Sequence, residues 1–180
     1  PQAVLRALNV RLPAAVRVLG IEEVGPEFHA RFNAVAKTYR YRIWNAEVLS
    51  PFERQYVWHV PGPVLDIDAM RHAAARIEGR HDFAAFQGTG SDAETSVRTI
   101  FHSRIEACAG PPREPLVTYE VRGDGFLRHM VRAIAGTLVE VGRGRHPASW
   151  VDEVLASRDR AAAGRTAPAA GLFLVGVEYP

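Results

Sequence analysis

Cysteine and lysine are nearly absent from this chain of 180 residues. Cys108 is the only cysteine, which excludes an internal disulfide and any zinc site built from several cysteines. Lys37 is the only lysine, so arginine supplies the other positive side chains. Arginine suits bidentate contacts with phosphate and stacking on bases. It is also the basic residue that a GC-rich genome encodes without selection for function, and both explanations stay open.

A long apolar run is also missing. No stretch reaches the roughly 18 apolar residues of a membrane-spanning helix, and no secretory signal is visible. The composition, 47% apolar and 23% charged, is ordinary for a globular protein. We therefore expect residues 1–180 to form a single domain in the reducing cytoplasm. The formal net charge of +2 is too small to indicate a nucleic-acid partner by itself.

Motifs for metal binding and for a nucleophilic serine are absent as well. The seven histidines and 20 acidic residues include no His-x-Glu and no His-Glu-x-x-His pattern. His72, His81 and His102 are interpreted as structural or solvent-facing residues. Residues 142–145, with the sequence GRGR, follow an apolar stretch too late to be a phosphate-binding loop. We therefore expect no metal site.

The most informative stretch is residues 123–144, GDGFLRHMVRAIAGTLVEVGRG. Glycines at both ends and apolar residues at helical spacing predict a helix. One side of this helix forms an apolar stripe, made of Met130, Val131, Ile134, Leu138 and Val141. Arg132 falls nearly opposite, beside Ala135, Gly136 and Val139. Small neighbours indicate a close-packed element near Arg132, and a buried guanidinium needs an anionic partner. The alternative is an arginine that reaches past them into water.

Hydrophobic periodicity along the rest of the chain predicts both strands and helices. The predicted strands are residues 16–24, 38–43, 55–60, 97–108, 116–121 and 172–179. Further helices are predicted at residues 1–13, 66–78 and 147–157, with Asp66 as the cap of the second. Adjacent strand pairs, with helices between them, favour an α+β fold in which the helices pack on a sheet.

Alternation in the strand at residues 38–43 places Tyr39 and Tyr41 on one face and Arg40 and Arg42 on the other. A half-buried strand with a solvated basic face explains this pattern without any functional role. A polar loop with two glycines is expected at residues 87–95. A proline-rich turn at residues 110–112 joins the fourth and fifth strands.

Five blocks of sequence carry a resemblance to a known family. They are FHARFNAVAKTYRYRIWN (28–45), GRHDFAAFQ (79–87), SVRTI (96–100), FLRHMVRAIAGTLVEVGRG (126–144) and GLFLVGVEYP (171–180). In this order they resemble the tRNA pseudouridine synthase A family. The turn that carries the catalytic aspartate of the family, a Gly-Arg-Thr-Asp-Ala-Gly-Val-His-like motif, does not occur here. The chain therefore resembles the carboxy-terminal two thirds of the enzyme, and we expect it to be inactive alone.

The resemblance implies a fold, a reaction and partners. The fold is one half of the pseudouridine synthase fold, a mixed and mostly antiparallel sheet with helices packed on it. The reaction isomerises uridine to pseudouridine in the anticodon stem-loop of tRNA, and it uses neither a metal nor an organic cofactor. The implied partners are tRNA and a second copy of the chain. A non-catalytic RNA-binding or dimerisation module with the same fold is the alternative.

The resemblance also assigns roles to five residues. Arg132 matches the basic residue that pairs with the nucleophilic aspartate and lowers the pKa of its carboxyl. Tyr39 matches the active-site tyrosine, whose ring can stack on a flipped uracil, a contact worth about 1–3 kcal/mol. Arg31, Arg128 and His129 are expected to contact the RNA backbone while the base is out of its stack.

Overall fold

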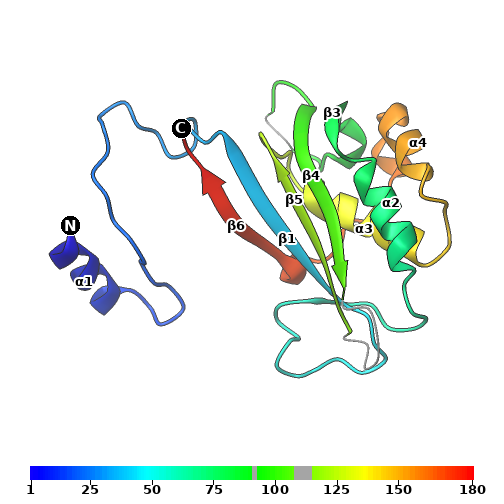
Figure 1. Cartoon of the computed structure of the whole chain (residues 1–180), viewed down its shortest axis with the longest axis horizontal. Helices are drawn as coiled ribbons and strands as arrows, with labels where there is room; N and C mark the ends of the chain where they lie inside the picture. Colours follow the sequence, from blue (N-terminus) through cyan, green and yellow to red (C-terminus); the bar gives the residue numbers. More distant parts are fainter. Residues whose placement is uncertain (91–92, 108–114) are drawn as a thin grey trace. The chain divides into compact units, whose positions relative to one another are not determined.

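The computed structural model of the chain describes residues 1–90, 93–107 and 115–180 (Figure 1). The proline-rich turn predicted at residues 110–112 and part of the polar loop at 87–95 lie outside these residues. The chain divides into two compact units, Pro1–Asn33 and Ala34–Pro180. No helix in the described part of the chain combines the length and the apolar character needed to cross a bilayer.

The first unit contains one helix and an extended segment. Helix α1 (Gln2–Arg11) has no buried residue. The strand predicted at residues 16–24 is wrong, because this segment forms no strand and most of its side chains are exposed. The side-chain amide of Asn9 takes the place of a neighbouring strand: it donates to the Val18 carbonyl and accepts from the Val18 N–H, both at 2.8 Å.

The second unit is built on a six-stranded sheet. Its strands are β1 (Ala36–Trp44), β2 (Trp58–His59), β3 (Gly79–Asp82), β4 (Val97–Ala107), β5 (Leu116–Gly123) and β6 (Leu172–Glu178). The order is β2-β1-β5-β4-β3, and β6 also pairs with β1. Among the described strands, β1 and β2 are the only pair that runs parallel. The mixed, mostly antiparallel sheet of an α+β fold is therefore confirmed.

Three helices accompany the sheet: α2 (Ile67–Ala75), α3 (Met130–Gly142) and α4 (Trp150–Ser157). Figure 1 shows them gathered on one side of β4 and β5. Asp66 caps α2 as predicted, because its carboxylate accepts from the N–H of Ala69 at 2.9 Å. Three short 3-10 turns, Ala84–Phe86, Arg160–Ala162 and Ala169–Gly171, complete the described elements.

The alternation predicted in β1 is confirmed. Tyr41 is fully buried under the helices, and Tyr39 is half-buried on the same face. On the other face Arg40 pairs with Glu120 of β5 at 2.7 Å, and Arg42 pairs with Glu53 at 2.9 Å. One face of the sheet is thus the core, and the opposite face carries ion pairs.

Helix α3 is buried around nearly its whole circumference, with only Arg132 and Glu140 partly exposed. Its apolar stripe packs into the main core. The opposite side is covered by the segment that leads from α4 to β6. A Cβ at Gly136 would lie 1.8 Å from the carbonyl oxygen of Arg165 in that segment. The close-packed element predicted beside Arg132 is therefore present.

Candidate active site

Four of the five predicted site residues line one cavity of about 280 Å³: Tyr39, Arg128, His129 and Arg132. The cavity lies where β1 and the start of β6 meet the N-terminal turn of α3. Leu172 contributes from β6, and residues 126–132 contribute from the turn and the helix. Two segments that are about 90 residues apart in the sequence therefore meet at this cavity because β1 and β5 are paired and β5 leads into α3.

The fifth predicted residue, Arg31, belongs to the first compact unit, Pro1–Asn33. Its side chain is exposed, and its guanidinium lies over the ring of Phe32, with 5.6 Å between the central carbon and the ring centroid. A cation over an aromatic ring is held weakly at an exposed site. The role of Arg31 in RNA binding stays a prediction.

Arg132 is half-buried, and its partner is a carbonyl. The Nε of Arg132 donates to the carbonyl oxygen of Ala167 at 2.6 Å, and the Arg132 carbonyl accepts from the Ala167 N–H at 3.1 Å. Among the residues that the structure describes, no carboxylate forms an ion pair with Arg132. The guanidinium is half-buried rather than buried. The pairing of Arg132 with an aspartate, which the resemblance implies, stays a prediction.

Arg128 and His129 form the turn that leads into α3. His129 has a left-handed backbone, with φ of 60°, so the chain turns sharply before the first helical residue. Arg128 is tied to the loop at residues 87–90: its Nη1 donates to the Gly90 carbonyl at 2.9 Å, and its own carbonyl accepts from the Gly88 N–H at 2.8 Å. A Cβ at Gly88 would lie 2.8 Å from Nδ1 of His129, so glycine permits this close approach.

Charge and burial set the protonation states in the cavity. Desolvation, together with the charges of Arg132 and Arg128, lowers the pKa of His129, which keeps the imidazole neutral at pH 7. Burial raises the pKa of Tyr39, so the phenol stays protonated and can donate a hydrogen bond. Among the residues that the structure describes, the lining contains two arginines and no carboxylate. The positive charge of the arginines favours an anionic group in the cavity, and the aromatic ring of Tyr39 favours a planar group beside it.

Phe126 and Gly88 contribute to the site, and the sequence reasoning did not select them. The rings of Tyr39 and Phe126 meet edge to face, with centroids 5.1 Å apart, which orients the tyrosine toward the cavity. Both residues lie in or next to the motif blocks at 126–144 and 79–87. That position in the sequence was the available signal, but the contacts themselves appear only in three dimensions.

The described residues contain no group of three or more His, Cys, Asp or Glu side chains that could hold a metal ion. The cavity is lined by two guanidinium groups, a protonated phenol, a neutral imidazole and apolar side chains. These groups can hold a carboxylate or phosphate, and they can stack on a flat ring.

Comparisons with known proteins agree with this chemistry. The profile of a family described as tRNA pseudouridine synthase matches residues 73–180. The tRNA pseudouridine synthase A of Myxococcus xanthus is 47% identical over 178 residues, which is 99% of this chain and 65% of the relative. The protein of the same name from Solibacter usitatus is 49% identical over 177 residues, which is 97% of this chain and 68% of the relative.

A third relative, the tRNA pseudouridine synthase A of Acetivibrio thermocellus, is 45% identical over 173 residues, or 96% of this chain and 68% of the relative. The chain thus spans about two thirds of the length of the curated relatives it matches. Identity at this level over nearly the whole chain establishes common descent and a common fold. The chain belongs to the tRNA pseudouridine synthase family.

Proposed function

We propose that this chain is the part of a tRNA pseudouridine synthase that supplies the uracil-binding wall of the active site. The activity is the isomerisation of uridine to pseudouridine in the anticodon stem-loop of tRNA. The observation that carries the proposal is the cavity of about 280 Å³ in which Tyr39 and Arg132 lie together. Family membership supports the same conclusion.

The reaction breaks the bond between ribose and a uracil nitrogen, rotates the base and rejoins it through carbon. A nucleophilic aspartate, as the resemblance implies, must be ionised and held in place. The terminal nitrogens of Arg132 are suited to this task, because only Nε is used by Ala167. A guanidinium in contact with a carboxylate lowers the pKa of the carboxyl and fixes its orientation. We assign no nucleophile within residues 1–180, and the activity is proposed for the product of the complete reading frame.

Tyr39 is assigned to recognition of the base. Its ring is held edge to face by Phe126, and its protonated hydroxyl can donate to a uracil carbonyl. Stacking on an aromatic ring compensates for part of the cost of removing the base from its stack. Arg128 and His129, at the exposed side of the cavity, are assigned to the neighbouring phosphates. Arg31, in the first unit, is assigned to the RNA backbone without a stated position relative to the cavity.

We further propose that the protein acts in the cytoplasm as a homodimer. The substrate that the names of the relatives give, tRNA, supports the location. Strand β6 supports association: within the described residues it pairs only with β1, and the side chains of Leu174 and Val175 are about half exposed. An uncovered strand edge with apolar side chains invites pairing with another chain.

The test replaces Arg132 by Ala and by Lys in the product of the complete reading frame. Turnover is measured as tritium release from tRNA labelled at C5 of uridine, and tRNA binding is measured separately. We expect turnover to fall by about 10²–10³-fold in Arg132→Ala, because a positioned cation is lost from the reacting centre. The tRNA dissociation constant should change by less than about threefold. Contacts with phosphates dominate the affinity for tRNA, and Arg132 is not assigned to a phosphate.

Arg104→Ala is the matched control, because this arginine is exposed on β4 and does not line the cavity. It should keep wild-type turnover. Turnover near wild type in Arg132→Ala would show that this arginine has no catalytic role. A wild-type protein that binds tRNA but releases no tritium would favour the non-catalytic RNA-binding module instead.

A further inference from the structure

We propose that residues 160–168 form a strap that positions Arg132, and that Thr137 fastens this strap to α3. The strap is the segment between α4 and β6 that covers one side of the helix. The inference rests on the proposed function only for the catalytic role of Arg132. The mechanical part, that Thr137 sets the geometry of the Arg132 side chain, stands on contacts alone.

The strap holds Arg132 through the backbone of a single residue, Ala167. The N–H of Ala167 donates to the carbonyl of Arg132 at 3.1 Å, and the carbonyl of Ala167 accepts from the Nε of the same residue at 2.6 Å. Ala167 is fully buried. Two bonds to the backbone of one buried residue hold both the backbone and the side chain of Arg132. The guanidinium is thereby held through Nε, which leaves its two terminal nitrogens for the cavity.

Thr137 holds the strap at Gly164, three residues before Ala167. Its hydroxyl accepts from the N–H of Gly164 at 3.0 Å and donates to the carbonyl of Ala133 at 3.0 Å. The side chain is 1% exposed, so no water competes for these bonds. One hydroxyl thus saturates a strap donor and a helix acceptor at the same time, and a methyl in its place would leave the Gly164 N–H without a partner.

Two glycines allow the strap to lie directly on the helix backbone. A Cβ at Gly164 would lie 2.8 Å from the Cα of Thr137, and a Cβ at Gly136 would lie 1.8 Å from the Arg165 carbonyl oxygen. The backbone of the strap therefore packs directly on the backbone of α3 between Gly164 and Ala167. A shift of the strap at Gly164 cannot be absorbed by compressible side chains.

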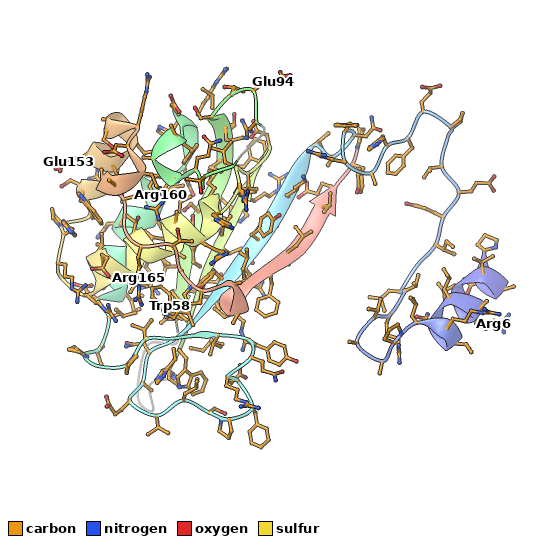
Figure 2. The ribbon with its side chains drawn as sticks, turned by 180° about the vertical axis from the view of Figure 1, so that it is seen from behind. Arg6, Trp58, Glu94, Glu153, Arg160 and Arg165 are labelled. Atoms are coloured by element: carbon orange, nitrogen blue, oxygen red, sulfur yellow. The ribbon has the colours of Figure 1, made fainter. Side chains whose placement is uncertain are left out.

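The strap is also rigid within itself. Arg160 donates from Nη1 to the Gly164 carbonyl at 2.9 Å and from Nη2 to the Thr166 hydroxyl at 2.7 Å. The guanidinium of Arg165 lies 4.9 Å from the ring centroid of Trp58, and Figure 2 shows both arginines along this segment. Beyond Ala167, the Pro168 carbonyl accepts from the buried hydroxyl of Tyr41 at 2.6 Å. A displacement at Thr137 is therefore transmitted along the strap to Ala167.

Thr137 itself does not line the cavity. It lies five positions after Arg132, which is about 7.5 Å along the helix axis. Any effect of Thr137 on the reaction must therefore pass through the strap and Arg132. This makes Thr137 a positioning residue.

The first arm of the test uses nuclear magnetic resonance on the 180-residue chain with labelled arginine. In the wild type the Nε–H of Arg132, assigned by its loss in Arg132→Lys, should exchange slowly with water. Thr137→Val should accelerate this exchange by about tenfold or more, and Thr137→Ser, which keeps the hydroxyl, should restore the slow rate. Arg160→Gln, a second variant that loosens the strap without touching α3, should act like Thr137→Val. The Nε–H of Arg122, bonded to Glu178 at 2.7 Å, is the internal reference that stays unchanged.

The second arm measures turnover by the product of the complete reading frame. Thr137→Val should lower kcat by about tenfold or more, as expected for a misplaced catalytic group, while KM for tRNA stays within about twofold. Thr137→Ser should recover most of kcat. Unchanged exchange at Arg132 in Thr137→Val, or an altered exchange with wild-type kcat, would overturn the proposal. If the wild-type protein shows no turnover, the proposed function fails, whereas the exchange arm still decides whether the strap positions Arg132.

Discussion

His129 is the residue whose charge the cavity controls most directly. It is exposed, yet the charges of Arg132 and Arg128 add to desolvation and lower its pKa. Because unfolding removes the desolvation and lets the two arginine side chains move away into water, the histidine of the unfolded chain binds a proton more readily. The stability contribution of the neutral form is therefore present above the ordinary pKa and is lost as the pH falls below it. At pH 7 the imidazole can offer RNA a hydrogen bond but no charge.

The titration of His129 provides a direct check. We expect its pKa, followed by the ring proton resonances, to lie below the model-peptide value of about 6.5. Arg128→Gln should raise this pKa because one repelling charge is removed. Arg104→Gln, on the outer face of the sheet, should leave it unchanged. A pKa at or above the model-peptide value in the wild-type chain would contradict the electrostatic description of the cavity.

The site residues differ in how far the sequence could predict them. Tyr39 and Arg132 were selected through motif blocks, and Arg132 also through its small neighbours on the helix. The carbonyl of Ala167 could not be predicted, because a backbone atom 35 positions away leaves no trace in residue type. Gly88 and Phe126 act through close approach and ring orientation, which depend on the paired strands and on the turn before α3.

At the scale of elements, the contact between α3 and the strap is the most demanding packing arrangement in the second unit. A helix normally gains roughly 1 kcal/mol when an interior glycine is replaced by alanine. At Gly136 this gain is outweighed, because the new methyl group would overlap the Arg165 carbonyl oxygen at 1.8 Å. Either the strap or the helix has to move.

We expect Gly136→Ala to lower the free energy of unfolding by roughly 1–3 kcal/mol, the range for overpacked cores. Chemical denaturation of the 180-residue chain measures the change. Gly176→Ala is the matched control, because a Cβ at that position in β6 meets no atom within 4 Å. This second variant should be neutral within about 0.5 kcal/mol. Equal stability of Gly136→Ala and the wild type would show that the strap is not closely packed.

The secondary structure was predicted well where side chains decide it. The strands at 97–108, 116–121 and 172–179 match β4, β5 and β6 within two residues at each end, and α2 begins at the predicted cap. The strand at 16–24 failed because alternation requires a partner strand, and an asparagine side chain bonds Val18 instead. Strand β3, with the polar sequence GRHD, was missed because it forms through its pairing with β4 rather than through propensity.

The whole chain consists of two compact units that differ in how they are stabilised. The buried hydrophobic residues begin at Ala36, so the described core is confined to the second unit. Helix α1 contributes no buried side chain. The expectation of a single domain over residues 1–180 stays a prediction, because compactness alone does not decide whether the two units fold together.

The oligomeric state can be checked at this scale. We expect multi-angle light scattering to give the mass of a dimer or larger assembly for the 180-residue chain, because β6 is an edge strand with Leu174 and Val175 about half exposed. Val175→Lys should shift the population toward monomer, since a charge blocks strand-to-strand pairing. Val64→Lys, at an exposed position before α2, serves as the control and should keep the wild-type mass. A stable monomer at high concentration in the wild type would contradict the homodimer.

The burial of α3 has a consequence for the way the cavity can change its width. We expect the amide hydrogens of this largely buried helix to exchange with solvent mainly when the surrounding unit opens globally. The wall of the cavity that α3 forms is thus expected to open only with the whole unit. The opposite wall belongs to β1 and to β6, an edge strand whose pairing with β1 is interrupted between Thr38 and Tyr39. If a nucleotide enters this cavity as proposed, we expect β6 and the adjoining part of β1 to move, while the wall that carries Arg132 keeps its geometry.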